Sequence, residues 1–200
     1  MDYRGFRTLF VVVALILSVI PSLPLLNLLV RFPSNYESFS ELSILGPNHT
    51  AEGYPFNVRI GEKYNVFVDV SNHLGGPAYY VVYVKLRNQT QPSPNSSRST
   101  PSPLLPLYES RFSIDKGESW EIPFTFAFTN TSHQETNHTL SGIFINDLAF
   151  SVDSKSKWDS RWNHHGFFYQ MFFELWLYDV NSKGFQFHNR FVGIWLNMTV

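Results

Sequence analysis

The sequence predicts an all-β fold, an immunoglobulin-like antiparallel β-sandwich of about seven to nine strands behind one N-terminal transmembrane helix. Two observations predict the sandwich: short segments alternate between apolar and polar residues, and clusters of Gly, Pro and Asn interrupt them about every 10 to 15 residues. The third observation, an apolar run without a charged residue at residues 8–30, predicts the helix.

The clearest strand lies at residues 64–71, where every second side chain is apolar. A period of two is that of a strand with one buried face. Residues 79–87 alternate in the same way. Because Gly75-Gly76-Pro77 between the two segments is typical turn material, we expect them to pair as neighbours in one sheet.

The other expected strands are residues 43–45, 51–60, 111–114, 120–128, 140–152, 167–179 and 191–200. Pro123 falls within one of them and cannot donate to a ladder, which predicts an edge position or a bulge there. Residues 167–179 are apolar on both faces, as in a strand that is buried on both sides.

Three polar segments are expected to be loops. Residues 91–106 hold five prolines and little apolar surface, which predicts an exposed, largely disordered loop, either a glycosylated connector or a polyproline ligand. Residues 130–138 form a second polar loop. Residues 154–166 form the third, and they place Trp158 and Trp162 beside two histidines.

The apolar run can cross a hydrocarbon core of roughly 30 Å. Arg4 and Arg7 precede it, so the positive-inside rule places the N-terminus in the cytoplasm and the rest of the chain outside the cell. A cleaved signal peptide is the alternative. The expected organisation is a cytoplasmic N-terminus at residues 1–7, a membrane anchor at 8–30, a stalk at 31–42 and an extracytoplasmic domain at 43–200.

The expected helix contains Pro21, Pro24 and Asn27. An amide that faces hydrocarbon needs hydrogen-bond partners, and proline frees backbone carbonyls, so these residues predict lateral packing against another membrane subunit. The alternative is that this half of the helix lies at the outer interface, where water satisfies the same groups.

Composition excludes several function classes. Charged residues make up 16% of the chain and its net charge is −1, which argues against nucleic acid as a partner. The chain has no cysteine, so disulfides, thiolate nucleophiles and cysteine-bound zinc are excluded. The nucleophile-elbow, His-Glu-x-x-His and phosphate-loop patterns are missing, and adjacent His164 and His165 would point to opposite faces of a strand. We therefore expect no enzymatic activity, no metal site and no cofactor.

Six Asn-x-Ser/Thr sequons lie beyond the apolar run and are candidates for N-linked glycans: Asn48, Asn88, Asn95, Asn130, Asn137 and Asn197. Asn88 and Asn95 flank the proline-rich segment and are expected to be modified first, since loops present the acceptor amide. Four aromatic residues, Trp158, Trp162, Phe168 and Tyr169, could form a platform for sugar rings or could pack as a small cluster.

Five stretches of the sequence, ILGPNHTAEGYP, GEKYNVFVDVSNH, KGESWEIPFTF, FELWLYD and FVGIWLNMTV, resemble the archaeal membrane-protein family catalogued as domain of unknown function 1616. The resemblance covers most of residues 43–200. It implies an archaeal source and an extracytoplasmic β-domain behind membrane helices, and it implies no known activity. The chain departs from the pattern in having one apolar segment where members often have several, and in an insertion around residues 158–165.

These features predict a non-enzymatic scaffold of the cell envelope, or an accessory subunit of a membrane complex, with a membrane or envelope protein as its partner. One alternative is a carbohydrate-binding module that uses the four aromatic residues. Another is a pilin-like or archaellum-like filament component, because Arg4-Gly5 before a long apolar segment resembles a processing site.

Overall fold

The computed structural model describes residues 3, 5, 7, 9–11, 13, 38–161 and 164–198. The chain divides into two compact units, Met1–Ser38 and Phe39–Val200. In the first unit, residues 3, 5, 7, 9–11 and 13 are helical, and no helix within the described part of the chain is long and apolar enough to cross a membrane. Most of the expected anchor at residues 8–30, including Pro21, Pro24 and Asn27, lies outside the described residues, so the anchor stays a prediction.

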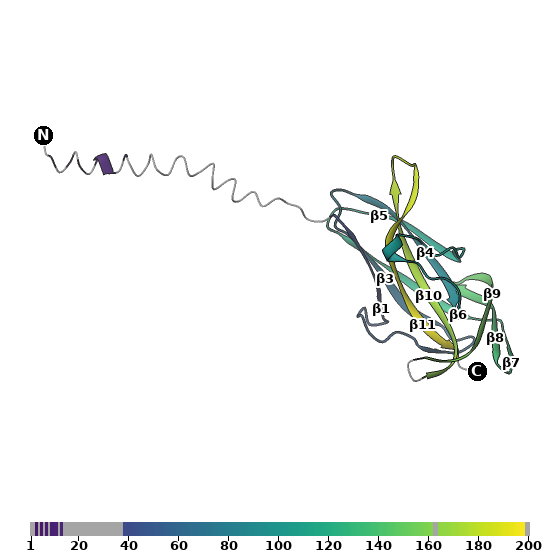
Figure 1. The fold of residues 1–200 in the computed structure, drawn as a ribbon. Coiled ribbons are helices and arrows are strands. Elements are labelled where there is room, and N and C mark those ends of the chain that lie inside the picture. The colour runs from purple at the N-terminus through teal and green to yellow at the C-terminus, as the bar shows by residue number, and fades with distance from the viewer. Residues whose placement is uncertain are drawn as a thin grey trace. The chain divides into compact units, whose positions relative to one another are not determined.

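The described part of the second unit is all-β, which confirms the predicted class (Figure 1). Its eleven strands exceed the seven to nine expected: β1 (Ser40–Leu45), β2 (Asn57–Val58), β3 (Tyr64–Asn72), β4 (Ala78–Asn88), β5 (Tyr108–Ile114), β6 (Ser119–Phe128), β7 (Thr131–Gln134), β8 (Asn137–Ile145), β9 (Leu148–Arg161), β10 (His164–Asp179) and β11 (Gly184–Met198). All pairs are antiparallel except β2 with β11.

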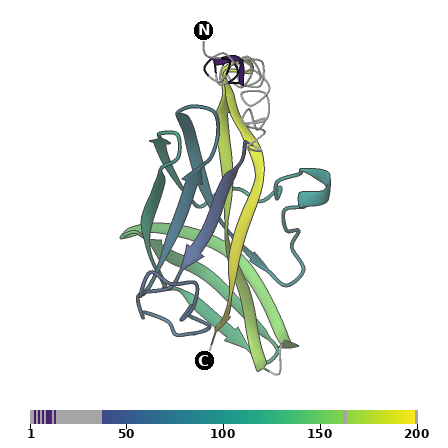
Figure 2. The same ribbon diagram turned by 90° about the vertical axis from the view of Figure 1, so that its left-hand side faces the viewer.

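The strands form two layers. In one layer the order is β1-β3-β6-β8, with β7 also on β8, and in the other it is β5-β4-β10-β11-β2. Strand β9 pairs with β8 along most of its length and with β10 at its end, so it connects the layers into one continuous path. Figure 2 shows β8 and β9, drawn in green, crossing the domain obliquely toward its C-terminal end.

The core lies between the two layers and is built by every second residue of the main strands. Phe124 of β6 meets Phe173 of β10 edge to face, with ring centroids 5.0 Å apart, and this contact joins the layers. Other fully or nearly fully buried core side chains are Val66, Val68, Val70, Tyr80, Val82, Val84, Phe126, Phe128, Leu140, Ile143, Ile145, Phe167, Tyr169, Met171, Leu175, Leu196 and Met198. The period of two seen in the sequence therefore selects the core correctly.

The predicted pairing of the two clearest strands is wrong. Strand β3 lies between β1 and β6, whereas β4 lies between β5 and β10 in the other layer. The glycine-rich connection crosses between the layers, and buried Asn72 holds it there. The Asn72 amide donates to the carbonyls of Gly76 (3.0 Å) and Ile114 (2.9 Å), and its oxygen accepts the Leu74 N–H (2.9 Å).

Two of the three expected loops are strands. Residues 131–134 and 137–145 form β7 and β8, and most of residues 154–166 belongs to β9 and β10. A two-residue turn at Asn146-Asp147, with φ of 46° and 63°, divides the single strand expected at residues 140–152 into β8 and β9. Positive φ at both positions is typical of a type I′ hairpin turn, which matches the twist of the flanking strands.

Pro123 has the edge position that the sequence predicts. Strand β6 pairs with β3 from residue 119 onward, but its pairing with β8 begins only at Phe126. Over its first half β6 therefore has a neighbour on one side only, where a missing donor costs little. The N–H of Thr125 is satisfied by the side chain of Asn146 at 2.8 Å.

The proline-rich segment is not a disordered loop. Residues 89–107, here called the strap, include a 3₁₀ turn at Ser96–Arg98 and pack on the outer face of the β4–β10 layer. There Lys85 and Glu174 form an ion pair of 2.8 Å whose side chains are 5% and 0% exposed. The pair binds the backbone of Ser102 on both sides, since Lys85 donates to its carbonyl (2.8 Å) and Glu174 accepts its N–H (2.7 Å).

Candidate functional site

An apolar groove of about 690 Å³ lies between β1 of one layer and β11 of the other. The loop between β1 and β2 closes its third side. The lining residues carry no charge: Leu42, Ser43, Ile44, Ala51, Gly53, Tyr54, Pro55, Phe56, Val192, Gly193, Ile194 and Trp195. We call this cavity the β1–β11 groove. Its size and apolar lining are those of a ligand-binding cleft.

Strand β1 turns an unpaired edge toward the groove. It pairs with β3 on one side, while the carbonyl of Ser40 accepts from Arg190 Nε (3.0 Å) and that of Ile44 accepts from the Tyr54 hydroxyl (2.7 Å). These two carbonyls therefore point away from β3. Because backbone direction repeats every second residue in an antiparallel ladder, Leu42 between them presents its N–H and C=O to the groove.

Strand β11 supplies the opposite edge. It pairs with β10, while the Asn197 N–H points to the other side and donates to the Phe56 carbonyl at 2.6 Å. By the same alternation Gly193 presents its backbone to the groove. A side chain at Gly193 would be crowded, since its Cβ would lie 2.8 Å from the Cβ of Phe172. Glycine at this position therefore lets β11 lie close to β10.

A pair of guanidinium groups stands at the Trp195 end of the groove. Arg87 Cζ lies 5.0 Å from the centroid of the Trp195 ring, and Arg161 Cζ lies 4.8 Å from it. Arg161 Nε meets Asp159 at 3.0 Å, whereas Arg87 donates to two neutral acceptors, Gln170 Oε1 (2.6 Å) and the Gln91 carbonyl (2.7 Å). Burial lowers the pKa of Arg87, and the charge of Arg161 lowers it further.

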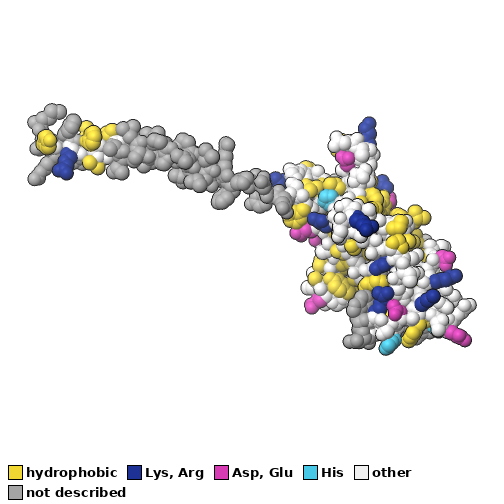
Figure 3. Space-filling view, viewed as in Figure 1, with side chains coloured by type: hydrophobic (Ala, Val, Ile, Leu, Met, Phe, Trp, Pro, Cys, Tyr) yellow, Lys and Arg dark blue, Asp and Glu magenta, His cyan; other side chains and the backbone are white. Residues whose placement is uncertain are grey.

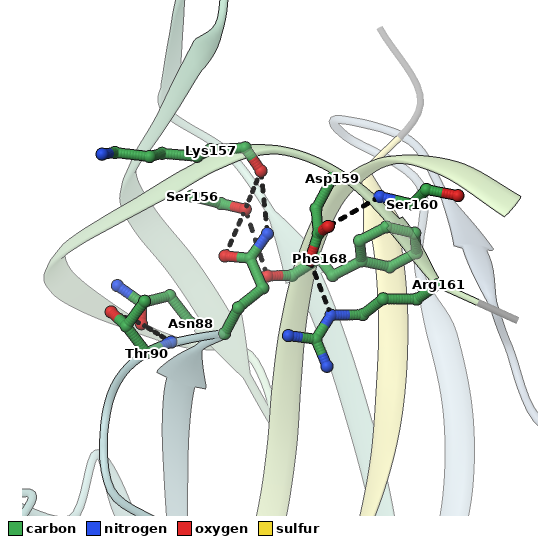
Figure 4. A network of polar contacts seen from close by, with 9 residues as sticks. Asn88, Thr90, Ser156, Lys157, Asp159, Ser160, Arg161 and Phe168 are labelled. Atoms are coloured by element: carbon green, nitrogen blue, oxygen red, sulfur yellow. Dashed lines mark hydrogen bonds and ion pairs between the residues drawn. The ribbon is translucent and has the colours of Figure 1, made fainter.

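A second, polar groove of about 510 Å³ lies beside β9. Its lining consists of Gln89, Thr90, Asn137, Lys155, Lys157, Trp158 and Asp159, and we call it the β9 groove. Side-chain amides bind backbone carbonyls of β9 here, in place of a neighbouring strand. Asn88 Nδ2 donates to the Lys155 carbonyl and Gln89 Nε2 donates to the Lys157 carbonyl, each at 2.8 Å, as Figure 4 shows in part. These bonds fix the turn after β4 against β9.

The structure does not assemble the four aromatic residues into one platform. Trp158 is 55% exposed and packs its ring edge to face on Phe167 at 5.2 Å. Phe168 and Tyr169 are fully buried, and as successive strand residues they point to opposite faces of β10. Trp162 lies outside the described residues. Of the described three, only Trp158 can meet a ligand at the surface.

Tyr169 is a buried polar residue of the core. Its hydroxyl donates to the His138 carbonyl and contacts His138 Nδ1, both at 2.9 Å. Burial raises the pKa of the Tyr169 hydroxyl and lowers the pKa of the His138 imidazole, so both groups stay neutral at pH 7. The Tyr169 hydroxyl therefore bonds to other buried groups of the core.

The sequons differ in accessibility. Asn48, Asn95, Asn130 and Asn137 are exposed, and Asn197 is buried in β11. The amide nitrogen of Asn88 donates to the Lys155 carbonyl, and its oxygen accepts the N–H groups of Thr90 and Gln91. The side chain of Asn95 is therefore exposed, although its oxygen accepts the Arg98 N–H at 3.0 Å, whereas the Asn88 side chain is held in the turn through both its nitrogen and its oxygen.

The described residues contain no cluster of three or more His, Asp or Glu side chains that could hold a metal ion. Sequence reasoning missed the β1–β11 groove and the role of Arg87, Arg161 and Trp195. One signal was available. Trp195 alternates with Ile194 and Leu196, so the large aromatic residue had to lie on the face of its strand that does not enter the core.

A family model described as Domain of unknown function (DUF1616) matches residues 33–140. The chain belongs to the DUF1616 family. The DUF1616 match includes β1, the loop that closes the β1–β11 groove and the strap, whereas β9 to β11 follow it. The family description assigns no activity. No curated protein matches the chain.

Solved structures offer only a weak likeness. Two crystal structures of a beta-glucosidase from Listeria innocua match this chain. The complex with gluconolactone has a TM-score of 0.33 at 16% identity over 59% of this chain. The complex with isofagomine has a TM-score of 0.36 at 12% identity over 81% of this chain. In both cases the match covers 16% of the beta-glucosidase chain. These scores are too low to assign a topology or an activity.

Proposed function

We propose that the chain is a non-enzymatic scaffold of the cell envelope, or an accessory subunit of a membrane complex, that takes an extended segment of a partner protein into the β1–β11 groove. The observation that carries the proposal is the pair of strand edges facing one apolar cavity, with the backbone of Leu42 on one side and that of Gly193 on the other. Addition of a strand to an open edge is a common mode of peptide recognition, in which main-chain bonds give affinity and side-chain pockets give specificity.

The proposal also includes the predicted setting. An anchor at residues 8–30 holds the chain in the membrane with a cytoplasmic N-terminus, and the immunoglobulin-like domain lies outside the cell with its exposed sequons. Support comes from the uncharged run and from the six sequons beyond it. A partner in the same membrane or envelope would then lie within reach of the groove. The archaeal source and the filament alternative remain predictions.

Crosslinking from the groove tests this function. The chain has no cysteine, so a single Ser43→Cys substitution can carry a photo-crosslinker into the groove, and Ser113→Cys on the edge strand β5 is the matched control. In native membranes we expect one discrete protein adduct from position 43 and none from position 113. Equal adducts from both positions, or none from either, would contradict the proposal.

A blocking variant separates the groove from the rest of the surface. Ala51 lines the groove and Ala149 is an exposed alanine of β9, so Ala51→Trp fills the cavity whereas Ala149→Trp adds the same side chain elsewhere. The adduct from position 43 should disappear in the first variant and persist in the second. An adduct that survives Ala51→Trp would show that the partner does not enter the groove.

The second candidate function is saccharide binding at the β9 groove, favoured by the exposed ring of Trp158 beside hydrogen-bonding side chains. Exposed aromatic rings stack on the apolar faces of sugars, and amide and charged groups bind the hydroxyls. In this candidate Trp158 acts without Phe168 and Tyr169, which are buried.

A further inference from the structure

The charge around the β1–β11 groove defines the chemistry of its occupant. The lining itself carries no charge, but arginines lie next to it: Arg190 bonds to the carbonyl of Ser40, two residues before the lining residue Leu42, and Arg87 and Arg161 lie over the ring of the lining residue Trp195. Arg190 and Arg87 have only neutral acceptors among their described hydrogen bonds. Among the described contacts of these three guanidinium groups, Asp159 supplies the one carboxylate.

The two arginines at the Trp195 end share one face of one sheet. In the strand register Gln170 is opposite both Arg87 and Trp195, and Arg161 is opposite His164, which lies on the same side of β10 as Gln170. Figure 4 shows the guanidinium group of Arg161 beside the carboxylate of Asp159, and Figure 3 shows Lys and Arg side chains, with Asp and Glu side chains among them, over the part of the domain where β9 and β10 lie. Two guanidinium groups thus lie together over the ring of Trp195.

The contacts of these arginines leave room for a carboxylate. Arg161 meets Asp159 through Nε, and its planar fork can offer both Nη groups to a second oxygen pair. Arg87 is held by Gln170 and Gln91, so its position is fixed without neutralising its charge. Two guanidinium groups that lie this close together in a half-buried place are stabilised by an anion between them.

We propose that the segment bound in the β1–β11 groove is an extended peptide with apolar residues in the groove and a carboxylate at its end, bound by Arg87 and Arg161 beside Trp195. This inference rests on the proposed function of the groove and adds the charge of the partner. The carboxylate is either an Asp or Glu side chain or the C-terminal carboxylate of the partner, and both present the same two oxygens to a guanidinium group.

A positional library of N-acetylated hexapeptides with alternating Val and Thr tests the proposal against the full-length chain by fluorescence polarisation. The last position holds Glu or Gln, and each peptide ends in a free acid or an amide. We expect the Glu amide, the Gln acid or both to bind at least about tenfold more tightly than the Gln amide, since a charged hydrogen bond contributes about 1.5–3 kcal/mol and 1.4 kcal/mol is tenfold. Preference for only the acid, or only the Glu side chain, identifies the source of the carboxylate.

Variants assign the effect to residues. Arg87→Gln and Arg161→Gln should each reduce the preference for the acidic peptides and leave binding of the Gln amide unchanged. Arg111→Gln is the matched control, because Arg111 also stacks on an aromatic ring of this sheet, with Cζ 5.4 Å from the Phe185 centroid, but lies away from the groove lining. The preference should persist in that variant.

The outcomes separate the two claims. Equal binding of all peptides that is lost in Ala51→Trp would overturn the carboxylate inference and leave the groove function standing. Acid-dependent binding that survives Ala51→Trp would place the carboxylate site outside the groove and would also overturn the inference. Absence of binding by every peptide would contradict the groove function and the inference together.

Discussion

The ion pair between Lys85 and Glu174 should be the most sensitive polar contact of the domain. It is buried on the outer face of the β4–β10 layer, and it holds the strap through both backbone groups of Ser102. Glu174→Leu removes the counter-charge of Lys85 and the acceptor of the Ser102 N–H. Breaking a buried pair from one side costs about 3–5 kcal/mol of unfolding free energy, because the remaining charge stays buried without a partner.

Lys85→Met should cost less, about 1–3 kcal/mol, because Glu174 keeps the Ser102 N–H and the Trp176 Nε1–H (3.2 Å) as donors. In the double variant no buried charge remains. We expect it to be at least about 2 kcal/mol more stable than Glu174→Leu alone, as replacement of a buried pair by apolar residues is often close to neutral. The strap, however, should be released in the double variant, since Ser102 has lost both partners.

Urea denaturation measures the global effect, and the rate of tryptic cleavage after exposed Arg98 in the strap measures the local one. Glu109→Leu is the control, because Glu109 forms an exposed pair with Arg111 that should contribute less than about 1 kcal/mol. Two results would contradict the predicted coupling between Lys85 and Glu174. The first is an equal loss of unfolding free energy in Glu174→Leu and Glu109→Leu. The second is a loss in the double variant that equals the sum of the two single losses. Unchanged cleavage at Arg98 in the double variant would show that other contacts hold the strap.

Three further predictions concern single sites. Trp158→Ala should abolish any saccharide binding on a glycan array and Trp120→Ala, equally 55% exposed but on β6, should not; equal behaviour of the two variants would count against the β9 groove. In material from the native host, glycopeptide mass spectrometry should find Asn95 occupied well above Asn88, whose amide is held by Lys155, and the reverse order would refute this use of the structure. Burial lowers the pKa of His138 from about 6.5, so protonation of its ring opposes folding. Its contribution to stability should be complete above pH 6.5 and should be lost as the pH falls below that value. The urea midpoint should therefore depend less on pH in His138→Gln than in the wild type between about pH 8 and pH 5. If the urea midpoint of His138→Gln depends on pH as strongly as that of the wild type, other groups cause the loss of stability in acid.

The sequence predicts strands where one face is buried and the other is not. Residues 64–71 show this pattern and form β3 almost within the predicted bounds, whereas residues 191–200 show it but belong to β11, which begins seven residues earlier, at Gly184. The pattern does not say which sheet a strand joins. The connection after β3 has the composition of a hairpin turn, but the contacts of Asn72 with Gly76 and Ile114 decide that it crosses to the other layer. Those contacts join residues that are far apart in the chain.

Strand β9 shows a second limit. Its residues near Ser154 and Ser156 are polar on both faces, so no alternation marks them, and a polar segment is expected to be a loop. Long-range pairing with β8 and β10 overrides this local preference. The buried hydroxyl of Ser156 has a partner, since its Oγ donates to the Gln89 side chain at 2.9 Å, whereas the buried Oγ of Ser154 makes no hydrogen bond to the described residues.

The candidate site could not be predicted from the sequence, because it too depends on contacts between segments that are far apart in the chain. The β1–β11 groove joins the first strand of the domain, the loop after it and the last strand, and Arg87 and Arg161 reach its end from two further strands. Each of these segments reads as ordinary strand or turn by itself. The sequence indicates Trp158 and Trp162 as candidate surface aromatics and does not single out Trp195.

The course of β9 bears on how the domain comes apart. In a sandwich whose layers touch only through side chains, one sheet can separate from the other while both keep their ladders. Here the backbone of β9 belongs to both ladders, so the layers cannot part until its hydrogen bonds to β8 or to β10 break. In a chain that has no disulfide to tie the layers, this shared strand should make them exchange their amide hydrogens through one common opening, with the slowest amides of β3 and β10 reporting the same free energy.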